Sequence, residues 1–255
     1  MKLFKVLPLL VAGAVVCAGC EDGTPVSGPA EVEEIRPGII RGYLDESEQP
    51  DSLNLVPAPP EEGSAAFARD VEIAQSVAAM VDTPAWEQAK RDANLRMPES
   101  INAFSAIIGL QISEEQTPHL YQLLRRAMAD AGLSGYKAKN HYTRQRPFMS
   151  NGQPICTPEE EDFLRGDPSY PSSHTALGWA WGLLLAEIVP QHADSLLKRG
   201  YDYGQSRVVC NVHWQSDVDA GRIIGAAAVA RIHANPTFQK DLKEAKKEAA
   251  RLMNQ

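Results

Sequence analysis

The stretch YPSSHTALGWAWGLLLAEIV, residues 170–189, places a histidine directly in front of a long apolar run that predicts a helix. Pro171 ends the preceding segment, and Ser172 is a natural N-cap. The backbone N–H groups of Ser172, Ser173 and His174 should then point outward unpaired. Such a helix N-terminus can bind an anion. Taken alone, a capped helix start with a structural histidine is the simpler interpretation.

Other segments also have a helical pattern. In TPHLYQLLRRAMADAG, residues 117–132, Thr117 is an N-cap candidate, Pro118 suits the first helical position, and apolar residues recur on one face. Residues 217–234, DVDAGRIIGAAAVARIHA, are rich enough in Gly and Ala to let a helix approach its neighbours closely. Alternating strand patterns of useful length are missing. We therefore predict an all-α fold, with one compact multi-helix domain over residues 64–255.

The composition limits the classes of function. The chain has 255 residues, of which 44% are hydrophobic, enough to bury a core. Its formal net charge of −8 argues against a non-specific nucleic-acid binder, which needs a basic surface to release counterions from phosphates. Any anion site must therefore be local.

The N-terminus resembles an export signal over residues 1–19. Lysines precede an apolar segment, VLPLLVAGAVVCAG, that is too short to span a bilayer comfortably. The small residues before Cys20 resemble a bacterial lipoprotein cleavage site, although Cys17 stands where Leu is more usual. We expect lipidation of Cys20 and a periplasmic, membrane-anchored protein, with an ordinary secretory signal as the alternative.

Residues 20–63 are rich in Pro, Glu, Gly and Ser, which predicts a tether or an extended arm. Its apolar pieces, GIIRGYL at 38–44 and SLNLV at 52–56, are candidates to dock on the main domain. Once the signal is processed, Cys156 and Cys210 are the remaining cysteines that can pair in an oxidising compartment. Two buried free thiols are the alternative that the residues leave open.

A basic cluster lies upstream of the histidine. In KNHYTRQRP, residues 139–147, six residues separate Lys139 from Arg146, and a proline closes the segment. Arg144, in the same segment, is either a spare cation near the anion site or an exposed side chain.

A third cluster lies downstream, in SRVVCNVHWQSD, residues 206–217. Arg207 is followed by His213, and His213 by Asp217. His213 and Asp217 are four residues apart, so on a helix the carboxylate reaches the imidazole. Trp214 could stack on a substrate ring, but core packing is the simpler interpretation.

The three clusters supply three cations, two histidines and one orienting carboxylate. Cations and a helix N-terminus suit a phosphoryl group, whose transition state spreads negative charge over its oxygens. One histidine can attack phosphorus while the other protonates the leaving alcohol. His213 suits the attack, because Asp217 fixes its tautomer and supports the charge that builds on the ring. None of these residues has metal-motif spacing such as HExxH.

These patterns, Lys-x6-Arg-Pro, Pro-Ser-x-His and Ser-Arg-x5-His-x3-Asp, resemble the signature of the type 2 phosphatidic acid phosphatase and vanadium haloperoxidase superfamily. The flanking segments KNHYTRQRPF, SYPSSHTALGWA and NPTFQKDL are similar to its soluble branch, the class A bacterial non-specific acid phosphatases. The likeness spans roughly residues 50–243.

The resemblance implies a role for each residue. His213 would be the nucleophile that becomes a phosphohistidine, Asp217 its partner and His174 the general acid. The phosphate oxygens would be bound by Lys139, Arg146, Arg207, Ser172 and the backbone N–H of Ser173. His213 must be neutral to attack and His174 protonated to donate, so their environments have to push the two pKa values apart.

The resemblance also implies a mostly helical domain, no metal or cofactor, broad phosphomonoester substrates, a homo-oligomer that is commonly a dimer, and a Cys156–Cys210 disulfide. One departure is Ser173, where the family usually has Gly. Because the backbone donor survives this change, we expect activity with an altered rate or substrate choice.

Three other functions compete with this interpretation. A vanadium haloperoxidase would use the same anion pocket for vanadate, although the flanking segments resemble the acid phosphatases. An integral lipid phosphatase would need several membrane spans, and no such segment follows residue 19. A phosphate-binding lipoprotein without catalytic activity would keep the cations but would not need both histidines.

Overall fold

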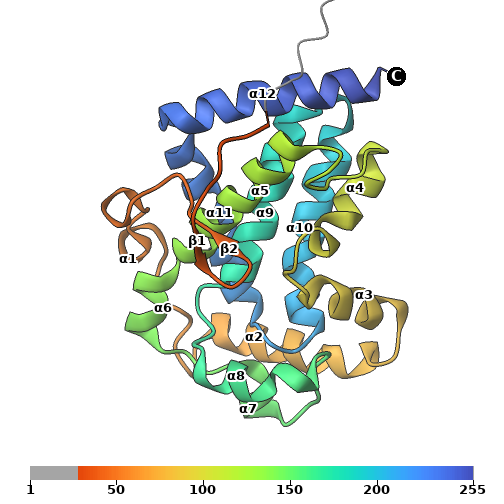
Figure 1. The fold of residues 1–255 in the computed structure, drawn as a ribbon. Coiled ribbons are helices and arrows are strands. Elements are labelled where there is room, and N and C mark those ends of the chain that lie inside the picture. The colour runs from red at the N-terminus through yellow and green to blue at the C-terminus, as the bar shows by residue number, and fades with distance from the viewer. Residues whose placement is uncertain (1–27, 255) are drawn as a thin grey trace, which may run out of the picture.

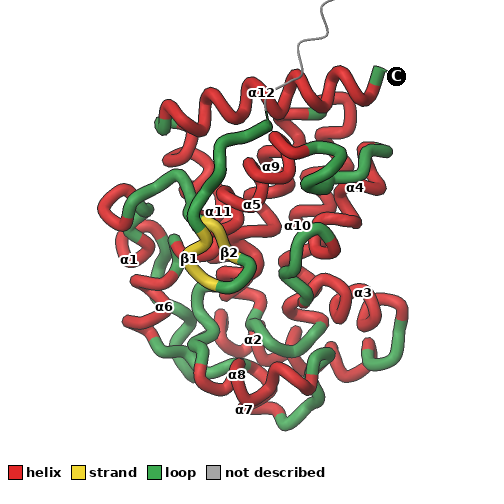
Figure 2. Tube along the Cα trace, viewed as in Figure 1, coloured by secondary structure: helices red, strands yellow, loops and turns green. Residues whose placement is uncertain are grey.

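The computed structural model describes residues 28–254, so the expected signal segment and Cys20 lie outside the described residues. Four long helices form the centre of the domain: α5 (Pro118–Leu133), α9 (Ser173–Ile188), α10 (Ala193–Val209) and α11 (Gln215–His233). Helix α9 packs against the other three (Figure 1). The all-α prediction is confirmed, because helices dominate the described part of the chain (Figure 2).

The remaining elements surround this centre. They are α1 (Ser52–Leu55), α2 (Ala65–Ser76), α3 (Pro84–Ala93), α4 (Asn102–Ile108), α6 (Tyr136–Tyr142), α7 (Pro147–Asn151), α8 (Glu161–Gly166), α12 (Pro236–Met253) and the antiparallel strands β1 (Glu34–Arg36) and β2 (Ile39–Ile40). Single 3-10 turns lie at Glu46–Glu48, Val77–Met80, Glu99–Ile101, Pro158–Glu160 and Pro190–His192. Helix α12 covers one end of the bundle, and α2, α7 and α8 lie at the other (Figure 1).

Helix α9 begins as the sequence predicts, with the hydroxyl of Ser172 accepting a hydrogen bond from the Thr175 N–H. Glycines allow its neighbours to come close. A Cβ on Gly182 would lie 3.1 Å from the Cα of Gly200 in α10, and a Cβ on Gly221 in α11 would lie 2.5 Å from the Ser172 carbonyl oxygen. The first contact would be tight for any larger residue, and only glycine permits the second. The start of α9 is therefore held tightly against α11.

The arm, residues 28–63, packs along the domain. Tyr43 is buried in the main core, and its backbone N–H donates to the Asp130 carboxylate of α5 over 2.7 Å. Further along, Ser52 and Val56 are buried, and the Ser52 hydroxyl accepts from the Ala138 N–H. Both apolar pieces of the arm thus contact the helical domain.

A second core lies beneath the helix ends. Cys156 and Cys210 form a disulfide with a Cα–Cα distance of 4.8 Å, which confirms the expected pairing. Around it pack Trp86, Phe148 and Val212. The bond ties the loop before α8 to the turn between α10 and α11. Within residues 28–254, no helix is both long and apolar enough to cross a membrane.

Candidate active site

The three sequence clusters meet at the end of the bundle opposite α12 (Figure 1). His174 lies in the first turn of α9, and Arg207 lies near the end of α10. His213 lies in the turn between α10 and α11, and Asp217 in the first turn of α11. Lys139 belongs to α6, and Arg146 precedes α7.

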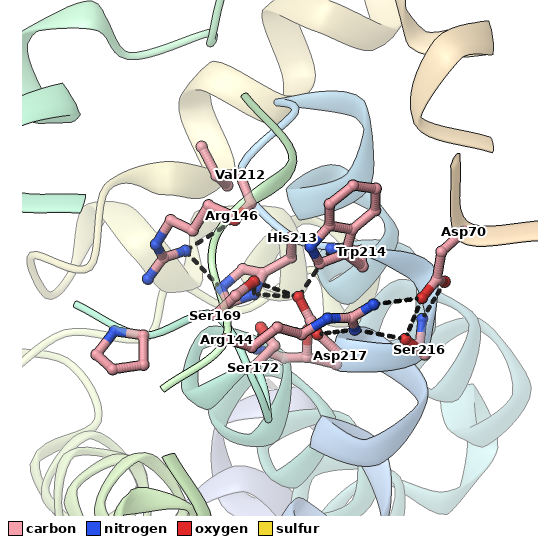
Figure 3. Close-up of polar contacts among 12 residues, drawn as sticks. Asp70, Arg144, Arg146, Ser169, Ser172, Val212, His213, Trp214, Ser216 and Asp217 are labelled. Atoms are coloured by element: carbon pink, nitrogen blue, oxygen red, sulfur yellow. Dashed lines mark hydrogen bonds and ion pairs between the residues drawn. The ribbon is translucent and has the colours of Figure 1, made fainter. Parts of the chain in front are cut away.

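His213 contacts Arg146 on one side and Asp217 on the other (Figure 3). Arg146 Nη1 lies 3.1 Å from His213 Nε2, and Asp217 Oδ2 lies 3.3 Å from Nδ1. Because a guanidinium can only donate, these partners assign the lone pair to Nε2 and the proton to Nδ1. Burial, with the charges of Arg146 and Lys139, holds the pKa of His213 well below its usual value. The ring is therefore neutral and presents a nucleophilic Nε2.

The four-residue spacing correctly predicted the His213–Asp217 contact, but His213 does not lie on a helix. The pair spans the start of α11, where Asp217 Oδ2 also accepts the Trp214 N–H over 2.8 Å. Ser169 donates to the same carboxylate oxygen. Trp214 is buried, and its Nε1 donates to the Gln145 carbonyl, which agrees with a packing role.

A carboxylate that the sequence analysis missed sits among the cations. Asp167 Oδ2 accepts from Lys139 Nζ at 2.6 Å and from Arg146 Nη2 at 2.7 Å. Burial and the charge of Arg146 lower the pKa of Lys139 to about 8. Two of the three expected phosphate-binding cations thus share one acidic partner.

Arg207 is the third cation, and it differs from the other two. It is buried, and its Nε and Nη1 atoms have no hydrogen-bond partner in the structure. The hydroxyl of Ser173 is likewise buried and unpaired. Buried donors without partners are costly, and few occur in native proteins. These donors are therefore available to an anion between Arg207 and the start of α9.

His174 is held by contacts that the sequence analysis also missed. Its Nε2 lies 2.6 Å from the carbonyl oxygen of Asp92, and its ring stacks on Tyr203 at 5.0 Å between centroids. Since a carbonyl only accepts, Nε2 carries a proton, and a second proton would be carried by Nδ1. Burial, then the charge of Arg207, lowers the pKa of His174 well below its usual value.

Both histidines thus have pKa values below the usual value of histidine. A bound phosphate dianion would change this. Its charge would offset that of Arg207 and raise the pKa of His174.

Arg144 is neither a spare phosphate ligand nor an exposed side chain. It donates to Asp217 Oδ1 at 2.6 Å and to Asp70 Oδ2 of α2 at 2.8 Å (Figure 3). Asp70 also accepts from the Ser216 N–H. Burial raises the pKa of Asp217, and the charge of Arg144 opposes that rise. Arg144 therefore helps to keep the carboxylate beneath His213 ionised.

Two hydrogen-bonding contacts fix the position of Ser172. Its hydroxyl caps α9, and its backbone N–H donates to the Asp217 carbonyl over 3.0 Å. Because its oxygen accepts from Thr175, its own hydroxyl proton is left to donate.

A cleft of about 980 Å³ opens beside His174 and Ser173. Its walls come from the β1–β2 turn, the segment after α3, and helix α5. In residues 28–254, no group of three or more His, Cys, Asp or Glu side chains is placed to hold a metal ion.

Comparison with known proteins agrees with this arrangement. Residues 123–240 match the family model of the PAP2 superfamily. The chain is 44% identical to a non-specific acid phosphatase of Providencia stuartii, over 94% of this chain and 97% of that protein. The chain belongs to the family of non-specific acid phosphatases.

Other members are also similar. A non-specific acid phosphatase of Salmonella typhimurium is 37% identical over 82% of this chain and 84% of its own length. An acid phosphatase of Zymomonas mobilis is 37% identical over 78% of this chain and 75% of its own. The alignment with the Providencia stuartii protein covers nearly the whole chain, so the family relationship extends beyond the helices around the site. The chain is thus an acid phosphatase by family, a hydrolase of phosphoric monoesters.

Proposed function

We propose that the chain hydrolyses a broad range of phosphate monoesters through a covalent phosphohistidine on His213, without a metal ion. The observation that carries this proposal is the pair of unsatisfied Arg207 donors next to a neutral His213. A tetrahedral anion placed between Arg207 and the start of α9 would satisfy those donors. It would also present phosphorus to a nitrogen lone pair.

In the first step, His213 Nε2 attacks phosphorus and the bond to the leaving alcohol breaks. The leaving oxygen takes the proton from His174 Nδ1, and Asp217 stabilises the positive charge on the His213 ring. In the second step, neutral His174 removes a proton from water, which attacks the phosphohistidine. The N–P bond breaks, and inorganic phosphate is released.

The cations Lys139, Arg146 and Arg207 would stabilise the equatorial oxygens throughout. The N–H of Ser173 and the hydroxyl of Ser172 would complete the cradle. An acidic optimum follows, because His174 needs a proton that its buried site holds weakly until an anion is bound.

The test is hydrolysis of p-nitrophenyl phosphate between about pH 4 and about pH 9 in excess EDTA. The wild-type chain should hydrolyse p-nitrophenyl phosphate fastest at acidic pH, and His213→Ala should lose this activity. His141→Ala is the matched control, because this exposed histidine lies on α6 close to the site. A folded wild-type chain that binds vanadate and oxidises bromide, but hydrolyses nothing, would instead support a haloperoxidase.

We also propose export to the periplasm, anchoring through lipidated Cys20, and assembly as a dimer. The N-terminal pattern supports the first two, and the Cys156–Cys210 disulfide fits an oxidising compartment. Labelling with a radioactive fatty acid should mark the wild-type chain and leave Cys20→Ser unlabelled. Light scattering on the mature chain tests the dimer.

A further inference from the structure

The cleft next to His174 is where the alcohol part of a substrate must lie. A general acid has to face the oxygen that it protonates, so the leaving alcohol contacts His174. The cleft touches both His174 and Ser173, and from there it extends between the β1–β2 turn and α5. This argument rests on the proposed hydrolysis.

Three arginines from separate segments line this cleft: Arg36 of β1, Arg96 after α3 and Arg125 of α5. Within residues 28–254, none of them forms a salt bridge. By contrast, Arg165 and Arg222, which lie outside the cleft, pair with carboxylates of their own helices. None of the three cleft arginines is thus neutralised by a carboxylate in direct contact, although the chain has a net charge of −8.

The other contacts of these arginines leave room for a ligand. Arg125 Nη2 lies 3.4 Å from the Gly38 carbonyl, and its guanidinium lies 5.7 Å from the centre of the Tyr121 ring. Two acids, Glu99 and Glu160, share the cleft, so its lining carries three arginines against two carboxylates. The lining charge is therefore positive.

Apolar side chains also line the cleft, among them Leu95, Met97 and Leu177. They suit the carbon skeleton of a small alcohol. A volume of about 980 Å³ is ample for a sugar with a further substituent. Arginine binds phosphate with paired, charge-assisted hydrogen bonds.

We propose that Arg36, Arg96 and Arg125 form a subsite for a second phosphate group. Preferred substrates are then bisphosphates: monoesters whose leaving alcohol carries another phosphate. His213 attacks one phosphoryl group, while the arginines hold the other at the far end of the cleft.

The test compares fructose 1,6-bisphosphate with fructose 6-phosphate, and uses p-nitrophenyl phosphate as the reference. The wild-type chain should favour the bisphosphate by about tenfold in kcat/KM, the effect of three exposed ion pairs of modest strength. The combined variant R36Q/R96Q/R125Q should lose this preference and keep its p-nitrophenyl phosphate activity. Arg165→Gln changes an exposed arginine that is paired with a carboxylate, and it is the control. It should change neither the preference for the bisphosphate nor the activity on p-nitrophenyl phosphate.

Calorimetry on His213→Asn measures the affinity of the subsite for both sugar phosphates in the absence of turnover. The bisphosphate should bind about tenfold more tightly, and the triple arginine change should remove that difference. Equal binding of the two sugars, or a preference that survives the triple change, would overturn the subsite. Absence of p-nitrophenyl phosphate hydrolysis by wild type would instead refute the proposed function, and the binding comparison would still decide the subsite.

Discussion

Asp70 is joined to Asp217 by the single guanidinium of Arg144, at 2.8 Å on one side and 2.6 Å on the other. Both carboxylates are buried. Helix α2, which follows the arm directly, thus reaches the carboxylate that supports His213. Arg144 acts through Asp217 and is a positioning residue.

Replacing Arg144 by Gln should lower kcat about tenfold or more and change KM little. Without the guanidinium, burial raises the pKa of Asp217 further, since Arg144 is the main opposing charge. Asp217 must be ionised to support His213, and activity falls as the pH drops through its pKa. The acid limb of the kcat profile should therefore move to higher pH, which rate measurements across the acidic range can show.

Arg165→Gln is the control for Arg144→Gln, and Arg144→Lys should restore part of kcat. A variant that loses thermal stability but keeps the wild-type pH profile would show that Arg144 serves only the fold. Removing one partner of a buried ion pair typically costs about 3–5 kcal/mol, so stability must be measured alongside.

Asp167→Asn should lower KM, and the inhibition constant of inorganic phosphate, by about three- to tenfold. The carboxylate competes with substrate phosphate for Lys139 and Arg146, and the amide keeps an acceptor without the charge. Steady-state kinetics with phosphate as inhibitor measure both constants. Asp162→Asn, an exposed acid on α8, is the control. A rise in KM would mean that Asp167 is needed to hold the two cations in place.

Ser173 can be tested through its backbone. Ser173→Gly should keep kcat/KM within about tenfold, because the N–H donor remains. Ser173→Pro removes that donor at the first position of α9, where proline is tolerated, and the extended Ser172 suits a following proline. A loss of about a hundredfold or more is expected for an oxyanion donor. Full activity of a folded Ser173→Pro chain would exclude the N–H from the cradle.

The ligand-free chain should lose stability as the pH falls below about 6.5, the usual pKa of histidine. His174 and His213 have depressed pKa values in the fold, so the unfolded chain binds their protons first. Each histidine then costs about 1.4 kcal/mol per pH unit, down to its folded pKa. Thermal melts at several pH values should show this loss.

In these melts, His174→Asn should lose less stability on acidification than wild type. His192→Asn, a change outside the site, should lose as much as wild type. Added phosphate should restore stability. A loss of stability on acidification that is the same in His174→Asn as in wild type would contradict the depressed pKa of His174.

Local patterns predicted the start of α9 and the contact between His213 and Asp217, because a cap or a four-residue spacing needs only neighbouring residues. The long-range partners carried no such signal. Asp92 holds His174 from another helix, and Asp167 lies between two cations that were assigned to phosphate. The chain has many acids, and only the fold singles out these two.

The long-range contacts of the arm were likewise not predictable from the sequence. Pro and Glu predict an extended segment, and this part of the chain has little regular structure. Its path is set by single residues: the Tyr43 backbone N–H donates to Asp130 of α5, and the Ser52 hydroxyl accepts from the Ala138 N–H of α6. The cleft wall at Arg36 could therefore be found only from the structure.

If His213 is the nucleophile, it carries a covalent phosphoryl group during turnover, and this group can be trapped. Wild-type chain is mixed with p-nitrophenyl phosphate in EDTA, quenched within milliseconds in alkali, where phosphohistidine survives, and analysed by peptide mass spectrometry. We predict one added phosphoryl group on His213 in the wild-type chain, and none at this position in His213→Asn treated in the same way. Rapid turnover with no phosphorylated His213 at any quench time, or with the label on another residue, would contradict it.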